Sequence, residues 1–342
     1  MAGSLPAQEQ RCNSFGTIFF DMLFSMPREN ERVSYAAFTH RLKMTNIAGR
    51  RSALIALLIL SLVWGANWIV MKTVLAYIGP ITFSAIRYVA GTMVLFLFLI
   101  VSRESLAPTP WKPTLLIGLT QTAGFQAFVQ LSLITGGAGK MALIAYTMPF
   151  WVIPLAWILL GDKPNGRQWA CIVLAAVGLI CILEPWRVQP ALISSLIALA
   201  AGLCWAIGTV LSKQQFQRRP DIPFMRWVTW QMAYGSVVLV VAALCVHERA
   251  TDWSPALYAS LAYNAVMSTG LAWALWLFAV QRLPANVAGL GSLFAPLVSV
   301  LLAWLFLGEM PDTAEFIGIA TIAIALIGVL RPAAKAPSLP AR

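Results

Sequence analysis

Ten long apolar runs follow one another along this chain, and they constrain its fold more than any other feature. A helix that crosses the hydrocarbon core of a bilayer needs roughly 17–25 mostly apolar residues. Helices suit this environment because each backbone N–H and C=O group finds its partner within the same segment. The runs lie at about residues 53–75, 81–101, 114–135, 141–161, 168–184, 191–213, 225–246, 255–281, 285–308 and 314–330. The sequence therefore predicts an all-α integral membrane protein with ten transmembrane helices.

The composition agrees with a membrane protein and offers little for metal or cofactor chemistry. The residues are 59% apolar and only 11% charged, whereas soluble proteins carry about 25% charged residues. Both histidines fall outside the apolar runs, and the five cysteines show no motif spacing. We therefore expect no metal, no cofactor and no disulfide framework.

One decapeptide is written twice, which indicates an internal duplication. Residues 155–164 read LAWILLGDKP and residues 302–311 read LAWLFLGEMP, 147 positions later. Pro149 and Pro296 share the same offset. Trp64 and Trp205 are each followed by a lysine eight residues later. We predict a first repeat at 51–187, a second repeat at 188–332, and a C-terminal tail at 333–342.

The two copies of the decapeptide end the fourth and ninth predicted helices, so an odd number of crossings separates them. They must then point in opposite directions through the membrane. The first copy is followed by Lys163 and Arg167, and the second by Met310 and Asp312. This difference fits the excess of basic residues on the cytoplasmic side. We therefore predict two inverted five-helix repeats, an architecture typical of alternating-access carriers.

The distribution of basic residues predicts the orientation of the chain. With the N-terminus inside, the outer loops carry only Lys140, Arg187 and Arg249, whereas 16 basic residues near helix ends lie inside. We expect a bacterial inner-membrane protein with both termini in the cytoplasm. The formal charge of +11 then faces anionic lipid, and no nucleic-acid partner is needed.

Residues 1–50 are the exception to this membrane pattern. They are polar and loosely patterned, and we expect a disordered tail. Met44 is an alternative start, which leaves open whether residues 1–43 are translated. An amphipathic segment that lies on the membrane is the other interpretation.

The residues in these segments resemble the drug/metabolite transporter superfamily of the EamA type. The resemblance covers residues 53–330 and depends on Trp64-Gly65-Ala66-Asn67, Arg87, the stretch AGKMALIAYTMPFW at 138–151, and the motifs LLGDKP and LGEMP. It implies a membrane carrier, commonly an exporter of amino acids or other small metabolites. It does not specify the solute.

Polar and aromatic groups inside the predicted helices are candidates for a solute site, because intramembrane polar residues often mark solute pathways. Trp64, Asn67 and Trp68 share one helix face. Pro149, Pro154 and Pro296 are candidate hinge positions. The candidate solute-binding residues are Trp64, Asn67, Trp68, Arg87, Gln126, Lys140, Tyr146, Trp151, Trp205 and Asn264.

Structural roles compete with each of these assignments. Asn67 could hold helices together, and Lys72, Arg87 or Lys140 could extend to the interface. Lys213 is expected only to extend to the interface. The remaining candidates, taken singly, are also compatible with helix packing.

None of the 13 acidic residues lies in the middle of a predicted helix. A carrier of cationic solutes is expected to place a carboxylate in its pocket. We therefore expect a neutral, zwitterionic or anionic solute, and any proton coupling would have to avoid a buried carboxylate. A homodimer is compatible with the sequence.

Secondary transport, with export of amino acids or related metabolites, is the function that the sequence favours. A carrier of phosphorylated or sugar-linked metabolites is the alternative. An intramembrane enzyme is disfavoured because no His, Asp or Glu lies in the middle of a predicted helix to serve a nucleophile. A receptor or scaffold would need a soluble output domain, and residues 1–50 are too sparse for one.

Overall fold

The computed structural model describes residues 47–184, 191–280, 282–283 and 294–330, and within these ranges the chain is helical without strands. The α-helices are α3 (Ile47–Thr73), α4 (Pro80–Val101), α5 (Trp111–Ile117), α6 (Phe125–Ser132), α7 (Ala138–Ala145), α8 (Met148–Leu160), α9 (Gly166–Leu183), α10 (Ala191–Arg218), α11 (Phe224–Cys245), α12 (Pro255–Ala262), α13 (Ala272–Val280), α15 (Phe294–Leu307) and α16 (Thr313–Leu330). A 3₁₀ turn, η2 (Val74–Ala76), follows α3, and two π-helical segments are η3 (Gly118–Gly124) and η4 (Tyr263–Leu271).

Six helices in the described part of the chain are long and apolar enough to cross a membrane. They are Arg51–Ala76, Pro80–Val101, Ala138–Leu160, Gly166–Leu183, Leu192–Arg218 and Phe224–Cys245. Many of their large apolar side chains are exposed, including Met93, Ile158 and Leu244. Soluble proteins rarely expose such continuous apolar surface. The protein is therefore a multi-pass membrane protein whose outer surface contacts lipid.

Two helical runs carry a π segment near the middle. The chain stays helical from Trp111 through η3 to Ser132, and from Pro255 through η4 to Val280. These runs match the predicted helices at 114–135 and 255–281, but the apolar pattern gave no sign of the π segments. The two segments occupy equivalent positions in the two halves. Adding the repeat offset of 147 residues to the bounds of η3 gives 265–271, which lies within η4.

Some predicted boundaries differ from the structure. The run predicted to end at residue 213 continues to Arg218, because lysine and glutamine extend a helix readily in water. The run predicted at 141–161 is interrupted at Tyr146 and Thr147. Pro149 has no N–H to donate to the carbonyl of Ala145, and this carbonyl instead faces Gly202 of α10. The start of the run predicted at 285–308, and most of both tails, lie outside the described residues.

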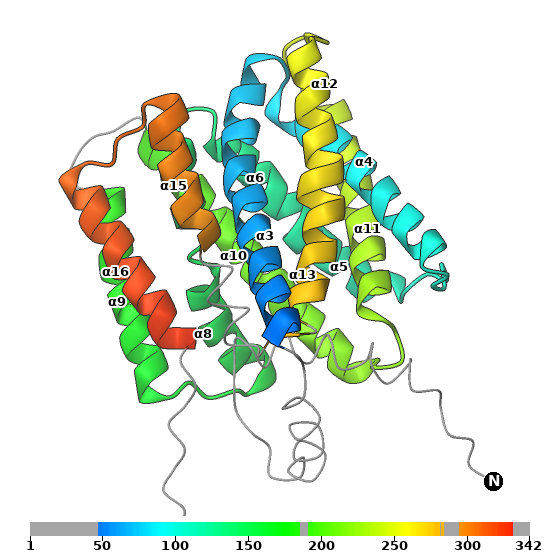
Figure 1. Ribbon diagram of the computed structural model, residues 1–342, viewed down its shortest axis with the longest axis horizontal. Coiled ribbons are helices and arrows are strands. Elements are labelled where there is room, and N and C mark those ends of the chain that lie inside the picture. The colour runs from blue at the N-terminus through cyan, green and yellow to red at the C-terminus, as the bar shows by residue number, and fades with distance from the viewer. Residues whose placement is uncertain (1–46, 185–190, 281, 284–293, 331–342) are drawn as a thin grey trace, which may run out of the picture.

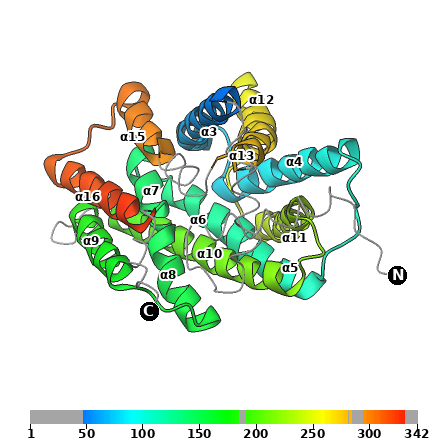
Figure 2. The ribbon, with the colours of Figure 1, turned by 60° about the horizontal axis from the view of Figure 1, so that its bottom comes forward.

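Helices α3 and α10 lie between the two edges of the assembly (Figures 1 and 2), and one face of α3 is exposed, with Ile55, Leu58 and Leu62 on it. The pair α9 and α16 lies at one edge, and the pair α4 and α11 lies toward the opposite edge (Figure 1). Helix α3 contacts α13 and α15, and α10 contacts α6, α7 and α8. The first helix of each half, α3 or α10, therefore packs against helices of the other half, and these helices occupy corresponding positions in the two repeats.

Individual contacts repeat this relationship between the halves. Thr92 of α4 hydrogen-bonds to Ser236 of α11 over 2.9 Å, and these residues differ by 236 − 92 = 144. We call residues at equivalent positions repeat mates. The offset is 141 between α3 and α10 (205 − 64), 144 between α4 and α11, and 147 from α5 onward (309 − 162). The offset grows in steps of three, which indicates short insertions in the second half.

Candidate solute cavity

A cavity of about 240 Å³ lies between the two halves. Its walls come from α3, α4, α6, α8, α10, α11, α13 and α16, together with both π segments. π segments occur frequently at functional sites. Here they place Gln121 and Thr122 of η3, and Ser268 and Thr269 of η4, on the cavity wall. These two pairs are repeat mates, so both halves contribute the same elements to one chamber.

Aromatic rings form much of the cavity wall. The Trp64 ring lies 6.5 Å from that of Trp273 and 6.3 Å from that of Trp276, and its Nε1 donates to the carbonyl of Ser268 at 3.2 Å. Its repeat mate, Trp205, lies 4.7 Å from the Phe125 ring in an edge-to-face arrangement. Large apolar faces on both sides favour a solute with a large apolar part.

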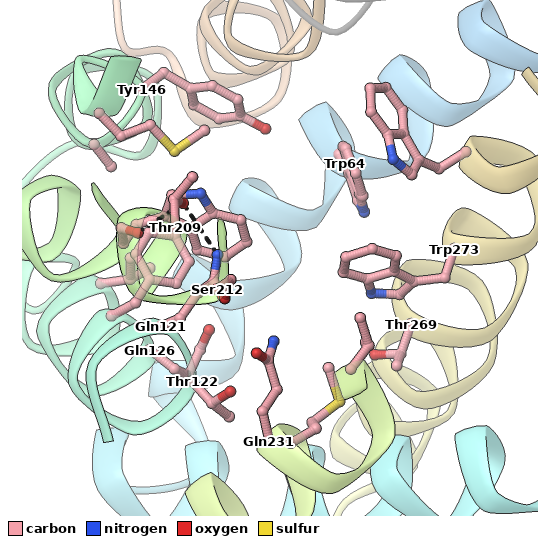
Figure 3. Close-up of a pocket in the computed structure, with 18 of the residues that line it drawn as sticks. Trp64, Gln121, Thr122, Gln126, Tyr146, Thr209, Ser212, Gln231, Thr269 and Trp273 are labelled. Atoms are coloured by element: carbon pink, nitrogen blue, oxygen red, sulfur yellow. Dashed lines mark hydrogen bonds between the residues drawn. The ribbon is translucent and has the colours of Figure 1, made fainter. Parts of the chain in front are cut away.

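Amide side chains and hydroxyl groups provide hydrogen-bonding groups on the wall. In Figure 3, Trp64 and Trp273 lie on one side, Gln121 and Gln126 lie on the other, and Gln231 projects between them. Gln121 donates to Thr209 Oγ1 over 3.2 Å and accepts from Ser212 over 3.4 Å.

Arg87 is the buried cation of the cavity wall. Its guanidinium Nη1 contacts the Met71 sulfur at 2.8 Å, and its side chain lies beside the Tyr88 ring at 5.2 Å. Gln126 Nε2 approaches the same sulfur at 3.7 Å. Within the described ranges no carboxylate forms an ion pair with Arg87, and its Nε has no hydrogen-bond partner. The repeat mate of Arg87 is the neutral Gln231, so the charge is confined to one half.

The cavity extends toward one end of the molecule only. At the end where α10 finishes, the wall includes Lys213, Phe216, Phe224 and Val228. In the described part of the chain, their repeat mates Lys72, Leu75, Pro80 and Ser84 lie outside the cavity wall. We call these two regions the open end and the closed end of the cavity.

Charged side chains form hydrogen bonds to helix ends at the closed end of the cavity. The Glu309 carboxylate accepts hydrogen bonds from the backbone N–H groups of Ala138 and Gly139, at 3.0 and 3.2 Å, at the start of α7. Lys72 Nζ donates to the carbonyls of Leu133 and Gly136 at 2.7 and 3.0 Å. Lys72 therefore binds the end of α6 in place of the expected extension to the interface.

The repeat mates of these residues meet at the open end. Asp162 is the mate of Glu309, and Lys213 is the mate of Lys72. Their side chains form an ion pair of 2.6 Å. The expectation that Lys213 only extends to the interface missed this partner.

The structure brings most of the sequence candidates into one cavity. Trp64, Asn67, Trp68, Arg87, Gln126, Tyr146 and Trp205 line it, as does Pro149.

The other candidates lie elsewhere. Lys140 borders a separate cavity and pairs with Glu315 at 2.6 Å. Trp151 packs against the buried cluster of α8 and α10. Asn264 is buried in η4 and donates to the Ser260 carbonyl. Pro154 lies inside α8 and Pro296 is buried in α15.

The candidate residues from the sequence did not include Gln231, Thr122, Thr269 or Trp273, which line the cavity. The internal repeat could have identified two of these residues. Gln231 and Trp273 are the mates of Arg87 and Gln126, so transferring each candidate to the other half would have found them.

Comparison with known proteins places these features in a family. The model of the EamA-like transporter family matches residues 51–184 and again residues 192–331. "Uncharacterized transporter YoaV" of Bacillus subtilis is 27% identical over 262 residues, covering 75% of this chain and 89% of that protein.

Two further relatives come from Escherichia coli. A "Probable amino-acid metabolite efflux pump" is 27% identical and covers 80% of this chain and 92% of its own. "Uncharacterized inner membrane transporter YedA" is 24% identical, with coverages of 80% and 88%. A solved crystal structure shares the fold with a TM-score of 0.58 at 19% identity, over 82% of this chain and 97% of that one.

Proposed function

The chain belongs to the EamA-like transporter family, and on this premise we propose that it is a secondary carrier that exports amino acids or related small metabolites by alternating access. The observation that carries the proposal is the cavity itself. Both halves line it with repeat mates, and it extends toward one end of the molecule only. The relative named as an amino-acid metabolite efflux pump supports export of this solute class.

The proposed architecture has ten spans in two inverted repeats, at 51–187 and 188–332. Four further spans join the six long helices: residues 111–132, residues 255–280, α15 and α16. The repeated decapeptide, the paired π segments and the exchange of contacts between the halves support this arrangement. Alternating access then follows if the two halves exchange conformations.

With both termini in the cytoplasm, the open end of the cavity faces inward. The described conformation then corresponds to the inward-open state, ready to take up a solute for export. The relative named as an inner membrane transporter supports an inner-membrane location. A homodimer remains compatible with the exposed apolar surface.

The wall chemistry favours amino acids over phosphorylated or sugar-linked metabolites. A phosphate group carries close to two negative charges at neutral pH. In the described wall, the cations are Arg87 and Lys213, and Asp162 already pairs with Lys213. Tryptophan rings and amides suit a solute with one carboxylate and an apolar part.

Counterflow in reconstituted vesicles tests this function. The purified full chain is placed in vesicles preloaded with unlabelled solute, and uptake of labelled amino acids, organic acids and sugar phosphates is measured. We expect exchange of amino acids. Exchange of sugar phosphates alone would favour the alternative function, and chemical conversion of a solute would favour an enzyme.

A further inference from the structure

Arg87 lies in the cavity wall as a cation without a counter-ion in the described part of the chain. Its side chain is only 7% exposed, and its one hydrogen-bond contact there is the weak acceptor sulfur of Met71. Burial of a charge without a partner is strongly unfavourable. A planar guanidinium matches a carboxylate particularly well, because two N–H groups can bind its two oxygens together. A negatively charged group of a solute in the cavity would supply this partner.

Asn67 supplies an unpaired acceptor next to this donor. Its side chain is 5% exposed, and its Oδ1 is buried without a hydrogen-bond partner. On α3, Asn67 precedes Met71 by four residues, which is one helical turn. The Met71 sulfur contacts Arg87, and Asn67, Met71 and Arg87 all line the cavity, so Asn67 and Arg87 belong to the same wall. A buried polar atom without a partner is costly, so a ligand donor is expected at Asn67.

We propose that Arg87 and Asn67 form the head-group site for a zwitterionic α-amino acid with a large apolar side chain. This inference rests on the proposed function. Arg87 binds the α-carboxylate, and Asn67 Oδ1 accepts a hydrogen bond from the α-ammonium group. These two charges are attached to one carbon atom, which fits a donor from α4 and an acceptor from α3 that line the same cavity. Aromatic rings nearby, such as Trp68, can also attract the ammonium group.

The rest of the cavity wall indicates which side chain the amino-acid solute carries. Beyond the head-group site, the wall is formed by Trp64, Trp273 and Trp276 on one side, and by Trp205 and Phe125 on the other. A phenyl or indole ring could contact these faces, whereas a small side chain would leave them uncovered. We therefore expect phenylalanine and tryptophan to be preferred over alanine.

Other solute charges fit the same residues less well. An amine without a carboxylate would leave Arg87 unpaired. A carboxylate without an ammonium group would leave the Asn67 oxygen unpaired. A dianion would bring a second charge, and the remaining cation in the described wall, Lys213, is already ion-paired.

Competition against labelled L-phenylalanine counterflow tests the head-group site in the wild-type protein. The competitors are L-phenylalanine, L-alanine, phenethylamine, which lacks the carboxylate, and 3-phenylpropionate, which lacks the ammonium group. We expect each incomplete analogue to compete at least tenfold more weakly, and alanine to compete weakly. Equal competition by phenethylamine or 3-phenylpropionate would overturn the proposal without any variant.

Two substitutions then assign the groups by a change in selectivity. Arg87→Gln should weaken L-phenylalanine at least tenfold while phenethylamine competes as before. Asn67→Leu should remove the discrimination against 3-phenylpropionate. Arg103→Gln is the control, because Arg103 is an exposed arginine outside the cavity.

The outcomes separate this inference from the proposed function. If amino acids exchange but Arg87→Gln lowers all solutes equally, the head-group site is wrong and the carrier function stands. If no amino acid exchanges while sugar phosphates do, both proposals fail.

Discussion

Single glycines decide how closely the helices of the two halves can approach. Gly91 of α4 lies against Thr269 of η4, and its repeat mate Gly235 of α11 lies against Thr122 of η3. These two threonines line the cavity. The position of the cavity wall therefore depends on the absence of a side chain at both glycines, one in each half.

Gly65, beside Trp64 on α3, gives a direct test of such an approach. A Cβ at this position would lie 2.5 Å from the Val298 side chain and 2.8 Å from the Ala295 carbonyl oxygen. Overpacking of this kind typically costs about 1–3 kcal/mol. We expect Gly65→Ala to lower the melting temperature of the detergent-solubilised protein. Gly166→Ala is the matched control, since nothing lies within 4 Å of its added Cβ. Equal melting temperatures for both variants would contradict the tight packing of α3 on α15.

At the scale of elements, the sequence predicted the helices better than their internal irregularities. Long apolar runs identify a helix because a backbone in lipid has few alternatives, and these runs gave α4, α9 and α11 nearly as observed, whereas α3 begins earlier and α10 ends later than predicted. The π segments leave no mark on hydropathy, since a π segment changes the backbone hydrogen bonding and keeps the same apolar side chains. The break at Tyr146 and Thr147 lies next to Pro149, which the sequence indicated as a candidate hinge position.

The attachment of α7 to Glu309 is an element-scale contact that we expect to control access to the closed end. A carboxylate at a helix N-terminus contributes about 1 kcal/mol, which corresponds to roughly a fivefold change in a two-state population. Glu309→Gln removes this charge and its attraction to Lys72. We therefore expect the variant to open the closed end more often.

Labelling of a cysteine at position 84 measures this opening. Ser84 is fully buried, whereas its repeat mate Val228 lines the cavity at the open end. In a background without the five native cysteines, Ser84→Cys should react a few times faster with an impermeant maleimide when Glu309→Gln is also present. Asp221→Asn serves as the control, because Asp221 is exposed and pairs with Arg219 far from this contact. An unchanged labelling rate would mean that Glu309 does not hold this end closed.

At the scale of the whole molecule, duplication explains both what the sequence revealed and what it concealed. Trp64 and Trp205 were identified as mates from their spacing to a lysine, and both line the cavity. Lys140 and Trp151 carry the same kind of signal as the cavity residues, a polar or aromatic group within an apolar run. Trp151 faces the buried cluster of α8 and α10, and Lys140 lies in the first turn of α7 at the closed end. The sequence does not fix the rotation of a helix that is apolar on all sides.

The inverted arrangement makes a further prediction about the two copies of the decapeptide. The loop after α8 contains Lys163, and the loop after α15 contains Met310. If the repeats are inverted, these loops lie on opposite faces of the membrane, with the more basic loop in the cytoplasm. Fusions truncated at Lys163 should give a fluorescent green fluorescent protein and an inactive alkaline phosphatase. Fusions truncated at Met310 should give the reverse result. The same result at both sites would rule out the inverted repeat. It would also rule out the assignment of the open end to the cytoplasm, because the inversion is what places the repeat mates at the two ends of the cavity on opposite sides of the membrane.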